Sequence, residues 1–226
     1  RFTLAAFAAQ GRDVKMSEKR VEGYRHFINK LWNAARFSLM HIEKGYDAID
    51  VKNISLQDRW ILSRLNRVAR QTEKALDAYK FNEAAGAVYQ FVWHELCDWY
   101  LEAIKPTLYD KAGDEERAAT LSVLWHVFKE ALILMHPFAP FVTEEIWHSL
   151  PGTDGSIMQA AWPDHIQPGD DPTAEAHMET VMAVITGIRN VRGEMSISPS
   201  TALSVAVHAE DSGVGKVVEN NSDLIV

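Results

Sequence analysis

The sequence predicts a mainly α-helical fold: an antiparallel helix bundle over residues 1–150, a linker over 151–173 and a small α/β appendage over 174–226. Three observations support this expectation. Apolar residues recur at helical spacing in four long segments before residue 150, which suits a bundle with one shared core. The next stretch is rich in Pro, Gly and Asp, as linkers are. Beyond it, residues 201–208 alternate apolar and polar side chains as a strand does, between two segments of helical pattern.

The boundaries of the predicted helices follow from their capping residues. Expected N-caps are Ser17, Ser55, Asn82 and Thr143. The first helix should reach about Ile42, and the second carries Asp58 three residues after its cap, the spacing of a capping box. The third should stop at Pro106, because proline interrupts a helix, and the fourth spans about residues 114–135. The strand needs partners, which we expect beyond Val226 or in residues 157–162.

The composition is that of an ordinary globular protein in a reducing compartment. With 226 residues, 47% of them hydrophobic, the chain can bury a sizeable core. One cysteine, Cys97, excludes an internal disulfide and a multi-cysteine zinc site, which favours the cytoplasm. Charged residues interrupt the apolar stretches, so we expect no membrane segment. The first residues lack a signal-peptide cleavage pattern and indicate a segment from within a longer protein.

Charge is distributed unevenly along the chain. The formal net charge of -8 argues at first against a nucleic-acid partner, because clustered lysines and arginines supply the affinity for phosphate. However, residues 1–36 hold eight basic and three acidic side chains, and residues 52–80 hold seven and three. Residues 81–226 hold seven basic and twenty-two acidic side chains. This asymmetry is expected when one face meets a polyanion and the remainder repels it.

Two strings suggest catalysis or metal binding, but each has a simpler explanation. The string Lys15-Met16-Ser17-Glu18-Lys19 is similar to the ATP-handling signature Lys-Met-Ser-Lys-Ser. No strand or glycine-rich turn precedes it, Glu18 would repel phosphate, and Ser17 serves as a helix cap. His94 and Cys97 lie one helical turn apart, yet no second pair of metal ligands accompanies them. We therefore predict no catalytic and no metal-binding residue in this chain.

The first predicted helix combines cations with aromatic rings. The basic side chains around it are Arg12, Lys15, Lys19, Arg20, Arg25, Lys30 and Arg36, and the interleaved rings are Tyr24, Phe27, Trp32 and Phe37. Single-stranded RNA is bound by such mixtures, because bases stack on rings while cations hold the phosphates. The same mixture also occurs on a solvated helix that covers a core. The residue types alone leave both interpretations open.

Four longer strings occur in order along the chain. They are Asn29 to Phe37 (NKLWNAARF), Trp93 to Glu102 (WHELCDWYLE), His136 to Trp147 (HPFAPFVTEEIW), and Ile188 to Met195 (IRNVRGEM) with Pro199. They resemble the anticodon-binding domain shared by valyl-, isoleucyl- and leucyl-tRNA synthetases, which are class I aminoacyl-tRNA synthetases. The last string resembles the valyl branch in particular. The resemblance implies a helical anticodon-binding bundle.

The resemblance also implies what surrounds this chain. Arg1 to Ala5 resembles the segment after the family's ATP-binding loop, so the catalytic and editing domains would lie outside the chain. The parent enzyme would join valine to tRNA(Val) with ATP and Mg, while this chain would need no cofactor. The chain would stop before the coiled coil in which valyl members usually end. We expect tRNA(Val) and the parent catalytic domain as partners, a monomeric state, a cytoplasmic location and no membrane.

The family's anticodon contacts correspond to specific positions in this sequence. Lys30 is expected to bind a base or a phosphate, and Phe37 to stack on an unstacked base. The further predicted RNA-binding residues are Asn33, Arg36, Lys19 and Trp99, the last closing the pocket from the third helix. A structural role is predicted for Pro137, Pro140, Thr143 and Trp147, which set a turn, a cap and a packing anchor. Two alternatives remain: the equivalent piece of an isoleucyl enzyme, and a helical protein-interaction module without an RNA role.

Overall fold

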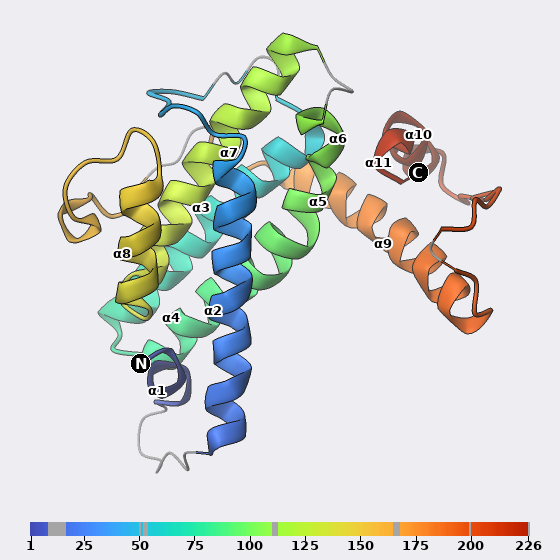
Figure 1. Ribbon diagram of the computed structural model, residues 1–226. Helices are drawn as coiled ribbons and strands as arrows, with labels where there is room; N and C mark the ends of the chain where they lie inside the picture. The colour runs from blue at the N-terminus through green and yellow to red at the C-terminus, as the bar shows by residue number, and fades with distance from the viewer. Residues whose placement is uncertain are drawn as a thin grey trace. The chain divides into compact units, whose positions relative to one another are not determined.

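The computed structural model describes residues 1–8, 17–49, 51, 54–109, 113–164, 168–198 and 200–225. Lys15, Met16 and Pro199 lie outside the described residues. The chain divides into two compact units, Arg1–Asp170 and Asp171–Val226. Figure 1 shows the helices of both units. The first unit carries the predicted RNA-binding residues.

The first unit is built from helices. They are α1 (Phe2–Phe7), α2 (Glu18–Leu39), α3 (Leu56–Asp77), α4 (Phe81–Gln90), the π-helix η1 (Phe91–Tyr100), α5 (Leu101–Ala103), α6 (Lys105–Leu108), α7 (Asp114–Met135), α8 (Pro140–Ser149) and the 3-10 helix η2 (Ile157–Gln159). The predicted caps Ser17 and Ser55 are confirmed: their side chains accept hydrogen bonds from the amides of Arg20 and Asp58. The predicted span of the fourth helix matches α7.

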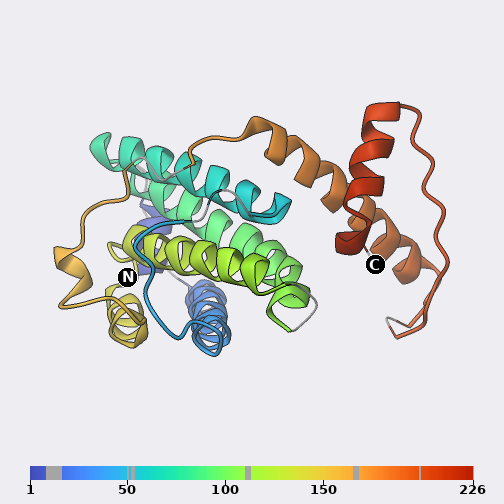
Figure 2. The same cartoon turned by 90° about the horizontal axis from the view of Figure 1, so that it is seen from above.

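Helix α7 is the most deeply buried helix of the bundle. It contacts α2, α3, α4, α6 and α8, and in Figure 2 it lies between α3 on one side and α2 with α8 on the other. Among the described residues it alone has the length and hydropathy of a membrane-spanning helix, although no membrane segment was predicted. The apolar stretch of α7 is 78% buried within the structure. Burial against five neighbouring helices accounts for this composition.

One buried carboxylate joins three helices. Asp58 in the first turn of α3 is fully buried and accepts hydrogen bonds from the Tyr100 hydroxyl of η1 at 2.7 Å and the Thr120 hydroxyl of α7 at 2.9 Å. Its carboxylate also accepts from the amide and hydroxyl of Ser55, which completes a capping box. Four donors compensate for the loss of hydration, which otherwise makes a buried carboxylate costly.

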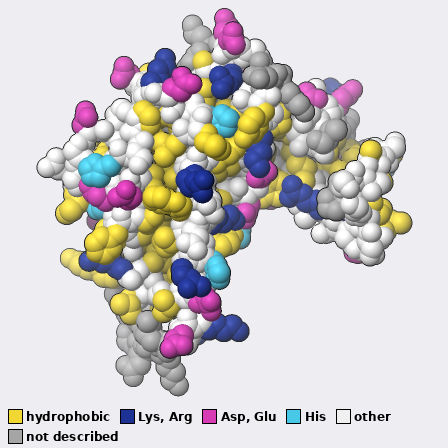
Figure 3. Space-filling view, in the orientation of Figure 1, with side chains coloured by type: hydrophobic (Ala, Val, Ile, Leu, Met, Phe, Trp, Pro, Cys, Tyr) yellow, Lys and Arg dark blue, Asp and Glu magenta, His cyan; other side chains and the backbone are white. Residues whose placement is uncertain are grey.

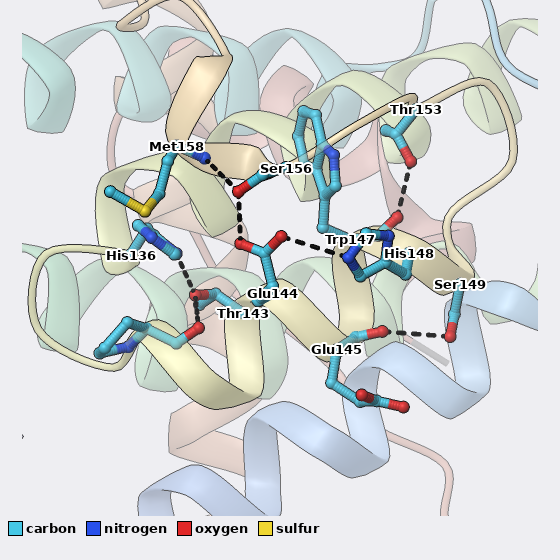
Figure 4. A network of polar contacts seen from close by, with 11 residues as sticks. His136, Thr143, Glu144, Glu145, Trp147, His148, Ser149, Thr153, Ser156 and Met158 are labelled. Atoms are coloured by element: carbon cyan, nitrogen blue, oxygen red, sulfur yellow. Dashed lines mark hydrogen bonds and ion pairs between the residues drawn. The ribbon is translucent and has the colours of Figure 1, made fainter.

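The turn before α8 differs from the prediction. α8 begins at Pro140 with Ala139 as N-cap, so Thr143 is not the cap. Thr143 is buried inside the helix, where its hydroxyl contacts His136 Nδ1 at 2.8 Å (Figure 4). The same hydroxyl donates to the carbonyl of Ala139 at 3.0 Å. Proline is favourable in the first helical turn, where its missing amide hydrogen breaks no hydrogen bond. The helix can therefore begin at Pro140, earlier in the chain than the predicted cap at Thr143. His136 and Thr143 close the turn through their side chains.

The third predicted helix also differs in detail. α4 begins at Phe81, and Asn82 lies inside it, so Asn82 is not the cap. The helix continues through η1 and α5 without interruption in sequence. The long helical segment ends close to the predicted stop: α5 ends at Ala103 with Ile104 as its C-cap, and Pro106 lies in the first turn of the short helix α6, a position that tolerates proline.

The segment after α8 packs on the first unit. The Trp125 indole donates to the carbonyl of Pro151 at 2.7 Å, and Glu144 binds both His148 and Ser156 (Figure 4). The backbones of Gly45 and Gly152 approach so closely that a Cβ on Gly152 would lie 2.6 Å from the Gly45 Cα. This part of the predicted linker therefore belongs to the first unit by its contacts.

The second unit contains α9 (Pro172–Glu194), α10 (Ser212–Asn220) and α11 (Ser222–Ile225). The prediction of an α/β appendage is wrong, because the described residues contain no strand. Residues 202–209 form neither helix nor strand, and no described residue makes a backbone hydrogen bond with them. Residues 157–162, one expected partner, lie in the first unit and include η2. Alternation of side chains alone does not make a strand, because a sheet also needs a neighbouring strand.

Candidate nucleic-acid interface

Helix α2 presents one face to the core and one to solvent. Its buried side includes Phe27, Leu31 and Ala35, which recur at helical spacing. Between Gly23 and Ile42 the sequence has no aspartate or glutamate. Figure 3 shows basic and hydrophobic side chains over the middle of α2, and acidic side chains near its start. The middle of α2 is thus suited to an anionic, aromatic ligand.

Lys30 is held by η1. Its ammonium forms an ion pair with Asp98 and lies 4.2 Å from the ring centroid of Trp93. Asp98 also binds His94 Nδ1 at 3.2 Å. Trp93 and Asp98 are five residues apart, and the wider π-helix, with its hydrogen bonds between residues five apart, brings such positions to the same face. In an α-helix they would lie about 140° apart around the axis.

Phe37 lies one and a half to two turns farther along α2. Its ring is half-buried, 5.2 Å from the His41 ring and 5.8 Å from the Lys105 ammonium. Burial, with a smaller contribution from Arg117, lowers the pKa of His41, so this imidazole is neutral at pH 7. The charge beside Phe37 therefore comes from lysine and arginine.

The six predicted contact residues fall into separate groups. Asn33, Arg36 and Phe37 line one open hollow of about 420 Å³ with Leu39 and Met40. Lys30 lies on the side of α2 that faces η1, and Trp99 is a partly buried residue of η1. Lys19 is exposed in the first turn of α2, about 16 Å along the axis from Lys30. The structure thus brings three of the six residues into one hollow.

Sequence reasoning missed four neighbours of these residues. They are Trp93 and Asp98 beside Lys30, and His41 and Lys105 beside Phe37. The sequence did not predict that Trp93 and Asp98 both contact Lys30, because regular helical spacing assigns positions five apart to different faces. One sequence signal could have predicted the carboxylate beside Lys30. Because residues 23–42 contain no aspartate or glutamate, a carboxylate that pairs with a cation in the middle of α2 must come from outside this run.

Two guanidinium groups of the second basic segment, residues 52–80, form ion pairs within the first unit. Arg64 on α3 binds Glu95 through two hydrogen bonds of 2.8 and 2.7 Å, and Arg70 pairs with Asp170 at 2.6 Å. Paired guanidinium groups offer less attraction to phosphate than unpaired ones. The acid-free run and the hollow lined by Asn33, Arg36 and Phe37 make α2 the stronger candidate for the interface.

The family of the chain follows from comparison with known proteins. Residues 58–207 match the family described as "Anticodon-binding domain of tRNA ligase". The chain belongs to this family. The matched residues begin at Asp58, so α2 lies before them.

Similar proteins point to one branch of this family. The chain is 53% identical over 211 residues to a "Valine--tRNA ligase" of Geobacter sulfurreducens, with 90% of this chain and 23% of that protein covered. It is 50% identical over 224 residues to the corresponding ligase of Syntrophotalea carbinolica, with 96% and 25% covered. These matches confirm the resemblance to the anticodon-binding region of valyl-tRNA synthetases. The chain spans about a quarter of the length of the curated relatives it matches.

A solved structure supports the fold. The leucyl-tRNA synthetase of Agrobacterium radiobacter K84, in a ternary complex with tRNA and LeuAMS, matches with a TM-score of 0.57. The alignment covers 91% of this chain and 26% of that one, at 14% sequence identity. At this identity the match shows a shared helical fold.

Proposed function

We propose that this chain binds the anticodon arm of tRNA(Val) through α2, as the anticodon-binding part of a valine–tRNA ligase. The observation that carries the proposal is the acid-free run from Gly23 to Ile42, which holds Asn33, Arg36 and Phe37 around one hollow. Unpaired anticodon bases need a ring to stack on and cations for their phosphates, and both are present. The four strings and the valine ligases similar to this chain support the choice of tRNA.

The parent protein would attach valine to this tRNA with ATP and Mg, using domains outside the chain. The relatives are about four times as long as the chain, which leaves room for such domains. An apolar groove offers a surface for the parent catalytic domain: Phe2, Val21, Ile28 and Phe138 line it, and Phe141 beside them is 90% exposed. Large exposed apolar side chains that cluster mark protein interfaces. We also propose that the protein is monomeric and cytoplasmic, where a single buried thiol suits reducing conditions.

Titration with RNA tests the proposal. An anticodon stem-loop of tRNA(Val) should bind the chain, and the affinity should fall as salt rises because bound phosphates release counterions. A stem-loop with the isoleucine anticodon should bind more weakly. Salt-independent binding, or no binding at moderate protein concentration, would contradict the RNA role and favour a protein-interaction module. Equal or tighter binding of the isoleucine stem-loop would contradict the valine assignment.

A further inference from the structure

Trp32 is the most solvent-exposed tryptophan among the described residues. It is 41% exposed, whereas Trp60, Trp125 and Trp147 are only 3 to 4% exposed. Its neighbours on the solvent side of α2, Asn29, Asn33 and Arg36, are exposed as well. An indole ring offers a large stacking surface, and leaving it in water forgoes the gain of burying it. The position of Trp32 at the edge of the predicted RNA-binding hollow suggests a ligand for this ring.

Arg36 supplies a positive charge beside this ring. Among the described residues it has no carboxylate partner, whereas other cations of the region do. These pairs are Arg25 with Glu22, Lys30 with Asp98, and Lys105 with Glu102. A guanidinium without an internal carboxylate can bind phosphate without first breaking an ion pair.

The positions on α2 order these groups around the helix. Phe37 and Trp32 lie five residues apart, which places them about 140° apart around the axis. Asn33 lies about 40° from Phe37, and Arg36 lies about 40° from Trp32, because each pair is four residues apart. A path across the solvent face of α2 therefore passes from a ring, over an amide and a guanidinium, to a second ring.

We propose that Trp32 is a second base-stacking platform, and that Arg36 holds the phosphate backbone that crosses α2 between bases stacked on Phe37 and on Trp32. The inference rests on the proposed function, since it assigns a further nucleotide to the same RNA. Single-stranded RNA fits this surface better than a protein partner does. A protein surface would bury Trp32 among apolar side chains, whereas its neighbours here are two asparagines and an arginine. Amides and guanidinium groups match bases and phosphates.

The test compares binding of the tRNA(Val) anticodon stem-loop by variants of the full chain. Trp32→Ala should weaken binding roughly five- to 150-fold, the range for loss of one stacked base. Trp32→Phe should restore most of the affinity, because a smaller ring still stacks. Phe81→Ala is the matched control: Phe81 is 42% exposed, on α4, and its loss should leave binding unchanged. Arg36→Gln should lower the salt dependence of binding by about one counterion.

Fluorescence gives an independent readout. A base stacked on Trp32 should quench its emission, so RNA should quench the wild type more than Trp32→Phe. If Trp32→Ala proves less stable than the wild type, the comparison of the wild type with Trp32→Phe still tests the inference with a folded variant. Binding of Trp32→Ala equal to wild type, while Phe37→Ala binds weakly, would overturn the second platform alone. Absence of RNA binding by the wild type would instead overturn the proposed function, and this inference with it.

Discussion

The Lys30 ammonium and the Asp98 carboxylate form an ion pair that joins α2 to η1. Asp98 thus occupies the position that an RNA phosphate would take on the lysine predicted to bind it. The Trp93 ring lies against the same ammonium and His94 binds the other carboxylate oxygen, so Asp98 is held from two sides. RNA that contacts Lys30 must compete with a carboxylate of the protein itself.

This competition gives a first prediction. Asp98→Asn should tighten binding of the anticodon stem-loop by about two- to fivefold, since a partly exposed ion pair contributes about 0.5 to 1 kcal/mol. The gain should vanish in the background of Lys30→Met, which removes the cation. Titrations of the wild type, both single variants and the double variant measure this coupling. Equal gains in both backgrounds would show that Asp98 acts on RNA through general charge repulsion.

Phe37 should contribute to both binding and stability. Phe37→Ala is expected to weaken RNA binding by about 1 to 3 kcal/mol, the contribution of one stacked base. Because the ring is half-buried beside His41, the variant should also lose some stability, but less than the roughly 3 to 5 kcal/mol typical of a core phenylalanine. Denaturant titration compares it with Phe91→Ala, which removes a core ring. A loss as large as that of Phe91→Ala would place Phe37 in the core.

Asp58 should be the most costly polar residue to remove. Asp58→Ala leaves the buried hydroxyls of Tyr100 and Thr120 without an acceptor and should cost about 3 kcal/mol or more of unfolding free energy. Asp77→Ala, an exposed change at the end of the same helix, is the control and should cost little. A small effect of Asp58→Ala would show that water replaces the carboxylate.

Asp58 also gives a prediction for pH. Burial raises the pKa of this carboxyl, against the opposing effect of its hydrogen bonds. A raised native pKa means that the native state binds the proton more tightly, so this contribution to stability is complete below the unfolded pKa and is lost as pH rises through the native pKa. The wild type should therefore gain stability relative to Asp58→Asn as pH falls toward about 4. Chemical denaturation of both proteins across this pH range measures the difference, and a constant difference would contradict the raised pKa.

Cys97 should be chemically inert in the native protein. Burial raises the pKa of its thiol to about 12, so almost none is thiolate at pH 8. A thiol reagent should react with the folded chain far more slowly than with the chain in denaturant. Fast reaction without denaturant would show that η1 opens readily around this residue.

The extended segment of the second unit should exchange its amide hydrogens quickly. Among residues 200–225 and the other described parts of the chain, none forms a backbone hydrogen bond with residues 202–208. Hydrogen exchange should therefore find these amides unprotected and those in the middle of α9 protected. Slow exchange at residues 202–208 would indicate that they pair with a strand in solution.

The sequence allowed the helical fold to be predicted well because its signals are local. Ser17 and Ser55 act as caps through residues three positions away, and the pattern of α7 is read within the helix itself. The prediction of a strand failed because pairing is not local: residues 201–208 alternate as a strand does, but no described segment makes backbone hydrogen bonds with residues 202–208. The caps at Asn82 and Thr143 failed because proline and neighbouring packing can start a helix earlier than a polar side chain suggests.

Only the part of the candidate site that lies on α2 could be predicted from the sequence. Asn33, Arg36 and Phe37 share a hollow because they lie close together on α2. The environment of Lys30 depends on a distant helix, and Asp98 is 68 residues away along the chain. Spacing within α2 carries no information about that carboxylate.

Because η1 is a π-helix, the number of residues between Trp93 and Asp98 decides whether these two side chains lie on the same face. The amide of Leu101 bonds to the carbonyl of Leu96, five residues back, and this wide turn sets Trp93 and Asp98 on one side. If the same residues formed regular α-helical turns, Trp93 and Asp98 would lie about 140° apart and Asp98 would turn away from Lys30, with every named side chain still present in the sequence. Deleting one of the four residues between them would instead return the two side chains to one face, about 40° apart. Homologous chains should therefore be compared by the number of residues between Trp93 and Asp98 as well as by the identity of these two side chains.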